Sequence, residues 1–126
     1  MFQVCIQEHF DAAHFLRNYQ GDCANLHGHR WMITVCVEGS RLDELGILLD
    51  FSEIKQSLRR ILKPFDHCLL NDLPSFAEIN PTAENLAKMI FQGLKGELPP
   101  AGSRLAWVRV NESPEAWVVY GEQGES

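Results

Sequence analysis

Three histidines have the residue types and the spacing of a metal site. His27 and His29 flank a single glycine, so an extended backbone would put both imidazoles on one side, about 7 Å apart at their Cα atoms. His14 ends an earlier alternation of apolar and polar residues, and antiparallel pairing of the two segments would carry it to the same point. Three neutral imidazoles are an established zinc ligand set, and they leave one coordination position open for water or substrate. The spacing therefore predicts a catalytic zinc ion held by His14, His27 and His29.

Spacing alone leaves two other interpretations of these histidines open. Cys23 lies shortly before His27 in the sequence, so it could be the fourth ligand of a closed structural site. Histidines in a chain of this size are also often surface or hydrogen-bonded residues with no metal. His9 has the opposite strand parity from His14, and we do not expect it to be a ligand.

Cys23 and the pair Asp66-His67 are candidates for proton transfer. If Cys23 is not a ligand, it lies in a polar loop beside the metal, where a thiol ionises more readily and can act as a base or nucleophile. An aspartate beside a histidine can fix the tautomer of the histidine and make it a proton carrier, although such a dipeptide is more often structural. The pair gains weight as a catalytic unit only if folding brings it to Cys23.

Glu112 is a candidate for ligand binding. It follows the apolar segment 105–111, and we expect it to be a solvated residue of a hairpin turn over 112–115. If it faces a pocket instead, its two carboxylate oxygens could accept paired hydrogen bonds from an amidine-like edge of a ligand.

The periodicity of apolar residues predicts the elements that must position these groups. Alternation of period two predicts strands over 2–14, 29–38, 105–111 and 116–120. Helical periodicity predicts helices over 50–64 and 80–94, with Asp50 or Ser52 capping the first, Pro64 ending it and Thr82 capping the second. The fold class that follows is α+β, a four-stranded antiparallel sheet with two helices on one face and the order ββααββ.

Composition limits the classes of protein to which this chain can belong. Its 126 residues are 45% hydrophobic and 22% charged, as in an ordinary globular protein, and we expect one domain spanning residues 1–126. A net charge of −6 disfavours broad binding to nucleic acid or to an anionic membrane. The first residues lack the features of a secretory signal, so we expect a cytoplasmic protein. No disulfide framework is expected, and Cys5, Cys36 and Cys68 are expected to be small buried hydrophobic residues.

Six motifs in order along the chain resemble those of the 6-pyruvoyl-tetrahydropterin synthase family, and most of all its bacterial 6-carboxy-tetrahydropterin synthase branch. They are F-D-A-A-H (10 to 14), C-x-x-x-H-G-H (23 to 29), G-x-x-x-D-F-x-E-I-K (46 to 55), D-H-x-x-L-N-D (66 to 72), N-P-T-x-E-N-L-A (80 to 87) and V-x-V-x-E (108 to 112). Any one of them is a weak signal, but together they cover nearly the whole chain.

The resemblance implies a T-fold subunit whose sheets join into a barrel, in a hexamer of two trimers with active sites at subunit interfaces. It implies 7,8-dihydroneopterin triphosphate as the substrate. Its residue roles are His14, His27 and His29 as ligands of Zn²⁺, Cys23 as general base, Asp66 and His67 as a proton relay, and Glu112 as the pterin anchor.

The resemblance leaves a choice of reaction. In the bacterial branch the substrate side chain is cleaved, which gives 6-carboxy-5,6,7,8-tetrahydropterin, acetaldehyde and triphosphate on the path to queuosine. The biopterin branch eliminates triphosphate and retains the side chain as a pyruvoyl group. The short interval from Cys23 to His27 resembles the bacterial branch, and the presence of Cys23 disfavours a third, folate-linked branch with glutamate near that position. A non-catalytic zinc- or pterin-binding module is the alternative from another class.

Overall fold

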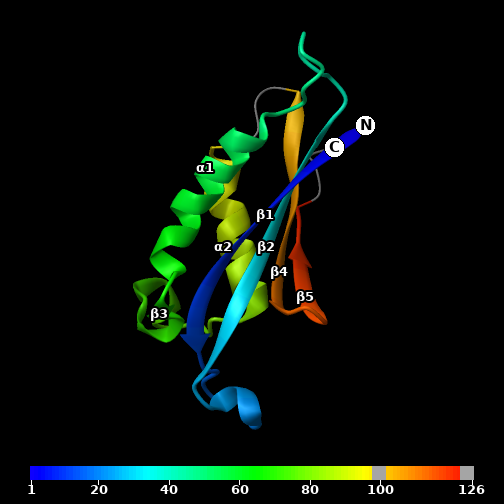
Figure 1. The fold of residues 1–126 in the computed structure, drawn as a ribbon. Helices are drawn as coiled ribbons and strands as arrows, with labels where there is room; N and C mark the ends of the chain where they lie inside the picture. The colour runs from blue at the N-terminus through cyan, green and yellow to red at the C-terminus, as the bar shows by residue number, and fades with distance from the viewer. Residues whose placement is uncertain (98–101, 123–126) are drawn as a thin grey trace.

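The computed structural model describes residues 1–97 and 102–122, in which five strands form one sheet and both helices pack on the same face of it (Figure 1). The strands lie in the order β3-β1-β2-β4-β5. Their bounds are β1 Phe2–His14, β2 His27–Gly39, β3 Cys68–Leu69, β4 Ser103–Ser113 and β5 Ala116–Tyr120. The predicted α+β class and the position of both helices on one face are confirmed.

The prediction of a four-stranded, wholly antiparallel sheet is wrong because of β3. This fifth strand is 2 residues long and pairs in parallel with Ala12 and Ala13 of β1. So short a strand has no alternation that a sequence could reveal. It forms through tertiary contacts, since the amide of His67 donates to the carbonyl of Asp11 at 2.6 Å just before β3 begins. The order of elements is therefore ββαβαββ rather than ββααββ.

The central feature of the sheet is the antiparallel pair β1 and β2, each 13 residues long. Their register runs without a shift from Phe2 opposite Gly39 to His14 opposite His27. β1 matches the predicted strand, whereas β2 begins two residues before the predicted range 29–38, so the whole His-Gly-His segment belongs to the strand. Both strands therefore carry their histidines at the same end of the sheet.

The two helices are α1, Phe51–Leu62, and α2, Ala83–Lys95. Asp50 caps α1 by accepting a hydrogen bond from the amide of Ser52 at 2.9 Å, and Thr82 caps α2 by accepting one from the amide of Asn85 at 3.1 Å. Both predicted helices and the caps Asp50 and Thr82 are confirmed. Neither helix of the described residues is long and apolar enough to cross a membrane.

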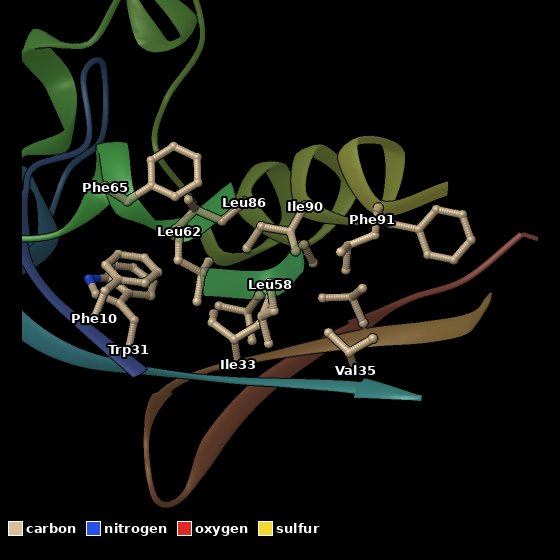
Figure 2. Close-up of a cluster of buried hydrophobic side chains, with 14 of the residues drawn as sticks. Phe10, Trp31, Ile33, Val35, Leu58, Leu62, Phe65, Leu86, Ile90 and Phe91 are labelled. Carbon is tan, nitrogen blue, oxygen red and sulfur yellow. The ribbon is translucent and has the colours of Figure 1, made fainter. Parts of the chain in front are cut away.

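The hydrophobic core lies between the sheet and the helices (Figure 2). Side chains of alternate parity on the strands meet the apolar stripes of both helices, and those labelled in the figure are Phe10, Trp31, Ile33, Val35, Leu58, Leu62, Phe65, Leu86, Ile90 and Phe91. The indole of Trp31 is fully buried and stacks on Phe10 with 6.0 Å between ring centroids. These aromatic rings close the end of the core that adjoins the histidines.

The cysteines only partly follow the prediction that they are buried. Cys36 is fully buried and Cys68 is half-buried, but Cys5 is exposed. Cys5 lies opposite Cys36 in the β1–β2 register, on the face of the sheet that no helix covers. A sequence pattern cannot separate these two environments, because the burial of Cys36 depends on neighbouring strands.

The loop between β1 and β2 is fastened to the segment that precedes α2. The guanidinium of Arg17 donates to the carbonyls of Phe76 at 2.7 Å and Asn71 at 3.2 Å. Within residues 1–97 and 102–122, four 3₁₀ turns occur in the connections, at Asp22–Ala24, Lys63–Phe65, Leu70–Asp72 and Pro74–Phe76. The chain beyond the end of β1 is therefore held near the start of α2.

We predict that Thr82→Ala destabilises the protein by about 1 kcal/mol, because the amide of Asn85 loses its acceptor. Urea unfolding followed by circular dichroism measures the change. Thr82→Ser keeps the hydroxyl and should lose much less stability. Equal losses in the two variants would show that the methyl group, and not the cap, stabilises the helix.

Candidate functional site

The side chains of His14, His27 and His29 converge at the end of β1 and the beginning of β2. One ring nitrogen from each lies within 4.8 Å of the others. The ring centroids are 4.5 Å apart for His14 and His27, 4.7 Å for His27 and His29, and 5.2 Å for His14 and His29. The register brings the rings together, because it pairs His14 with His27 and Ala12 with His29. The described structure therefore joins the three predicted ligands, and His9 is not among them.

Hydrogen bonds orient two of these rings toward the centre of the cluster. The Nδ1 atom of His14 lies 2.7 Å from the carbonyl oxygen of Pro81, and that of His27 lies 2.6 Å from the carbonyl oxygen of Asn25. Because a carbonyl oxygen can only accept, each Nδ1 carries the proton and each Nε2 keeps a free lone pair. This is the arrangement typical of histidine ligands to a metal.

Two nitrogen atoms in the cluster are buried without a partner. Nε2 of His14 and Nε2 of His29 have no hydrogen bond among the described residues. Buried polar atoms in proteins are nearly always satisfied, so such a pair calls for an explanation. A divalent cation bound by the three imidazoles would satisfy both atoms, and the site therefore fits a metal ion.

Burial favours the neutral form of two of the three rings. It lowers the pKa of His14 to about 4, against the hydrogen bond to the Pro81 carbonyl that favours the charged ring. Burial also lowers the pKa of His29, against the attraction of the Glu112 carboxylate. Neutral rings are competent ligands near pH 7, since no proton has to leave before a cation binds. The indole of Trp31 closes the inner side, with ring centroids 4.8 Å from His14 and 5.2 Å from His29.

Cys23 lies in the 3₁₀ turn of the loop between β1 and β2 and is half-buried. Its carbonyl oxygen accepts a hydrogen bond from the amide of Leu16 at 2.8 Å, which ties the turn to the end of β1. Its sulfur is not one of the atoms that lie within 4.8 Å of one another in the imidazole cluster. The described geometry thus gives a group of three nitrogen donors, rather than a closed set of four with the thiolate.

Asp66 and His67 form a hydrogen-bonded pair at the edge of the sheet. The Oδ2 atom of Asp66 lies 2.9 Å from Nδ1 of His67, while its Oδ1 atom accepts a hydrogen bond from the amide of Asp11 at 3.0 Å. The hydrogen bond from Asp11 and then that from His67 lower the pKa of Asp66. His67 adopts a left-handed backbone conformation with φ of 57°, which is uncommon for a residue other than glycine.

Within one chain the pair does not meet Cys23. No hydrogen bond or ion pair of the described residues links Cys23 to Asp66 or His67. Both members of the pair contact Asp11, whose side chain alternates with those of Ala12 and His14 and so lies on the opposite face of β1 from the imidazole cluster. The described residues therefore bring together the three predicted metal ligands but not the three groups that were expected to move protons.

Sequence reasoning missed the ion pair that borders Asp66 and His67. Arg30 lies opposite Asp11 in the register and donates to both of its carboxylate oxygens, at 2.9 and 3.2 Å. The signal was present, because pairing His14 with His27 also pairs Asp11 with Arg30. Asp11, Asp66 and His67 have the proximity of a cation site, but Arg30 already occupies the carboxylate of Asp11. We therefore do not assign a metal to this group.

Glu112 is not in the hairpin turn where it was expected. β4 continues through Ser113, beyond the predicted end at residue 111, and Glu112 is a half-buried strand residue. It lines a cavity of about 150 Å³ together with Ala83, Trp117 and Val118. The pocket-facing interpretation is the one that the geometry favours. Pockets for drug-sized ligands usually have volumes of roughly 300–1,000 Å³, so this cavity is large enough for only part of such a ligand.

We predict that metal-free protein loses stability as pH falls from about 6.5 toward 4. The folded-state pKa of His14 is about 4 against an ordinary value of 6.5, so in this window only the unfolded chain takes up the proton. The loss should approach roughly 3 kcal/mol at the lower end. Urea unfolding at a series of pH values measures it. His14→Gln keeps a donor for the Pro81 carbonyl and should flatten this part of the profile; an unchanged slope would contradict the assignment.

Comparison with known proteins agrees with this geometry. The chain is 32% identical to a Bacillus subtilis protein named 6-carboxy-5,6,7,8-tetrahydropterin synthase, over 94% of this chain and 84% of that one. It is 31% identical to the 6-pyruvoyl tetrahydrobiopterin synthase of Dictyostelium discoideum, over 79% and 73%. The structure of Caenorhabditis elegans 6-pyruvoyl tetrahydropterin synthase superposes with a TM-score of 0.85 at 26% identity, covering 97% of this chain and 96% of that chain. A family profile described as 6-pyruvoyl tetrahydropterin synthase matches residues 3–123, and the chain belongs to that family.

Proposed function

We propose that this protein is a zinc-dependent lyase that converts 7,8-dihydroneopterin triphosphate and one water molecule to 6-carboxy-5,6,7,8-tetrahydropterin, acetaldehyde and triphosphate, a step of queuosine biosynthesis. The observation that carries the proposal is the convergence of His14, His27 and His29, with two buried nitrogen atoms that lack a partner among the described residues. The similarity to a protein named 6-carboxy-5,6,7,8-tetrahydropterin synthase supports the choice of reaction.

Zinc is the ion that this ligand set suits best. Three neutral imidazoles with an open position are a ligand set of catalytic zinc, and the hydrogen bonds from His14 to Pro81 and from His27 to Asn25 would hold the rings in place. When bound, the ion would supply Lewis-acid polarisation of the side-chain oxygens of the substrate. The buried wall of Trp31 excludes water from the inner side of the cluster.

Four residues carry the remaining chemistry in this proposal. Cys23 is the general base that removes a proton from the substrate side chain. His67, oriented by the carboxylate of Asp66, carries a proton to or from the reacting oxygens. Glu112 accepts hydrogen bonds from the N3 and 2-amino groups of the pterin, and its place beside a small cavity near α2 supports that role.

The separation of these groups within one chain motivates an oligomer. Cys23 and the Asp66-His67 pair are not in contact, and the cavity beside Glu112 is small for the whole substrate. We propose that subunits join edge to edge into trimers, that two trimers form a hexamer, and that Cys23 of one subunit meets His67 of another. Among the described residues, the outer edge of β5 and most of the outer edge of β1 have no neighbouring strand, which leaves two edges for such pairing.

The sister reaction, elimination of triphosphate without cleavage of the side chain, is the second candidate. Identities of 32% to a 6-carboxy enzyme and 31% to a 6-pyruvoyl enzyme are too close to separate the two. The interval from Cys23 to His27 favours the 6-carboxy branch. A non-catalytic zinc- or pterin-binding module would need the same cluster but no proton-transfer groups.

Product analysis separates the two reactions. Incubation of the zinc-loaded protein with 7,8-dihydroneopterin triphosphate should release acetaldehyde and give 6-carboxy-5,6,7,8-tetrahydropterin, measured by liquid chromatography and mass spectrometry. Accumulation of 6-pyruvoyl-tetrahydropterin would identify the sister enzyme instead. Tight binding of the pterin without any product would favour the binding module.

Cys23→Ala should abolish turnover and leave the metal in place. Loss of a general base lowers the rate by about 10²–10⁴-fold, whereas the three imidazoles are untouched. Steady-state kinetics and metal analysis by mass spectrometry measure both effects. Cys5→Ala, at an exposed cysteine far along β1, is the matched control. Loss of zinc in Cys23→Ala but not in Cys5→Ala would instead favour a structural site with the Cys23 thiolate as a ligand.

A further inference from the structure

The contact between Asp11 and Arg30 is an exposed ion pair with little to contribute to stability. The side chains are 38% and 64% exposed, and ion pairs of this kind are usually worth under about 1 kcal/mol. The backbone of Asp11 does not need the pair, because it is already fixed in the continuous β1–β2 ladder. A purely structural role therefore accounts poorly for a two-pronged contact at this position.

The position of the Asp11 carboxylate is what the ion pair controls. One of its oxygens lies within 4.8 Å of both a carboxylate oxygen of Asp66 and a ring nitrogen of His67. Asp66 already occupies Nδ1 of His67 at 2.9 Å. A released Asp11 side chain would therefore be a second carboxylate acceptor close to the ring of His67.

Arg30 holds this competing carboxylate of Asp11 in an ion pair. Its Nε and one terminal nitrogen take both carboxylate oxygens of Asp11, a forked geometry that a lysine cannot reproduce. Arg30 follows the candidate ligand His29 on β2, and strand alternation directs its side chain to the opposite face from the imidazole cluster. A hollow of about 620 Å³ beside the pair is lined by Asp11, His29, Arg30 and His67, among others.

We propose that Arg30 is a positioning residue for the Asp66-His67 pair, which it protects by holding the Asp11 carboxylate away from Nδ1 of His67. The proposal rests on the proposed function, in which His67 moves a proton. With Arg30 in place, Asp66 is the acceptor for Nδ1 of His67 and sets the orientation of the ring. Without Arg30, the Nδ1 hydrogen bond of His67 is shared between the carboxylates of Asp66 and Asp11. The ring then turns, and its Nε2 atom no longer points in the direction that catalysis needs.

Steady-state kinetics of four variants test the proposal. Arg30→Gln should lower kcat by about tenfold, the usual cost of losing a residue that orients a catalytic side chain, with KM and zinc content unchanged. The kcat of Arg30→Lys should lie between those of the wild type and Arg30→Gln, because lysine keeps the positive charge but cannot donate to both carboxylate oxygens in the same forked geometry. Asp11→Asn combined with Arg30→Gln should recover most of kcat, since the competing carboxylate is gone. Arg104→Gln removes a comparable sheet-surface ion pair with Glu38 and should behave as wild type.

The double variant decides between this role and a structural one. A normal kcat in Arg30→Gln, or a loss that Asp11→Asn does not repair, would overturn the proposal. If wild-type protein has no turnover, the proposed function fails first, and the NMR chemical shifts of the ring nitrogens of His67 become the readout, because Nδ1 lies 2.9 Å from Asp66. A shift change in Arg30→Gln that the double variant reverses supports the role, and shifts that are unchanged or not restored overturn it.

Discussion

Backbone pairing between β1 and β2 is the constraint on which the site depends. Antiparallel partners at positions 14 and 27 set His14 beside His27, and the same ladder fixes the pairs Ala12–His29 and Asp11–Arg30. A slip of one residue would turn one strand over and send its side chains to the wrong face of the sheet. The apolar residues that share the parity of the histidines prevent such a slip, because the slip would expose the core of Figure 2.

The two faces of this strand pair have opposite electrostatic characters. On the helix side, burial lowers the pKa of His14 and His29, and their Nε2 atoms have no hydrogen-bond partner among the described residues. On the other face, charged groups balance each other in hydrogen-bonded contacts that remain open to water. The first environment favours cation binding, because neutral nitrogen ligands that are already shielded from water lose little hydration when they bind an ion. Proton movement favours the second, where a charged imidazole can be stabilised by a carboxylate. The two faces therefore differ in the kind of chemistry that each environment favours.

Local pattern predicted those parts of the fold that repeat with a period. The alternation in 2–14, the apolar stripes of both helices and the caps Asp50 and Thr82 all have their expected positions. β3 could not be found this way, because its formation depends on contacts between Asp11 and a segment 55 residues later. The imidazole cluster was predictable because each of its histidines lies on a regular strand. The surroundings of Glu112 were not, because they depend on a strand that continues past its apolar stretch.

The groups predicted to transfer protons show a second kind of structural information that a sequence does not contain. Cys23, Asp66 and His67 were identified by residue type, yet type and order say nothing about whether two groups meet within a chain or between chains. The left-handed conformation of His67 and its pairing with Asp66 emerge only from the fold.

The close approach of Trp31 to two of the candidate ligands gives the protein an internal reporter. The indole meets the rings of His14 and His29 edge to face, so an ion bound to those rings would bring a double positive charge close to the fluorophore. Charge at that range perturbs the excited state of an indole. Occupancy of the centre should therefore be visible as a change in intrinsic emission, without any added dye.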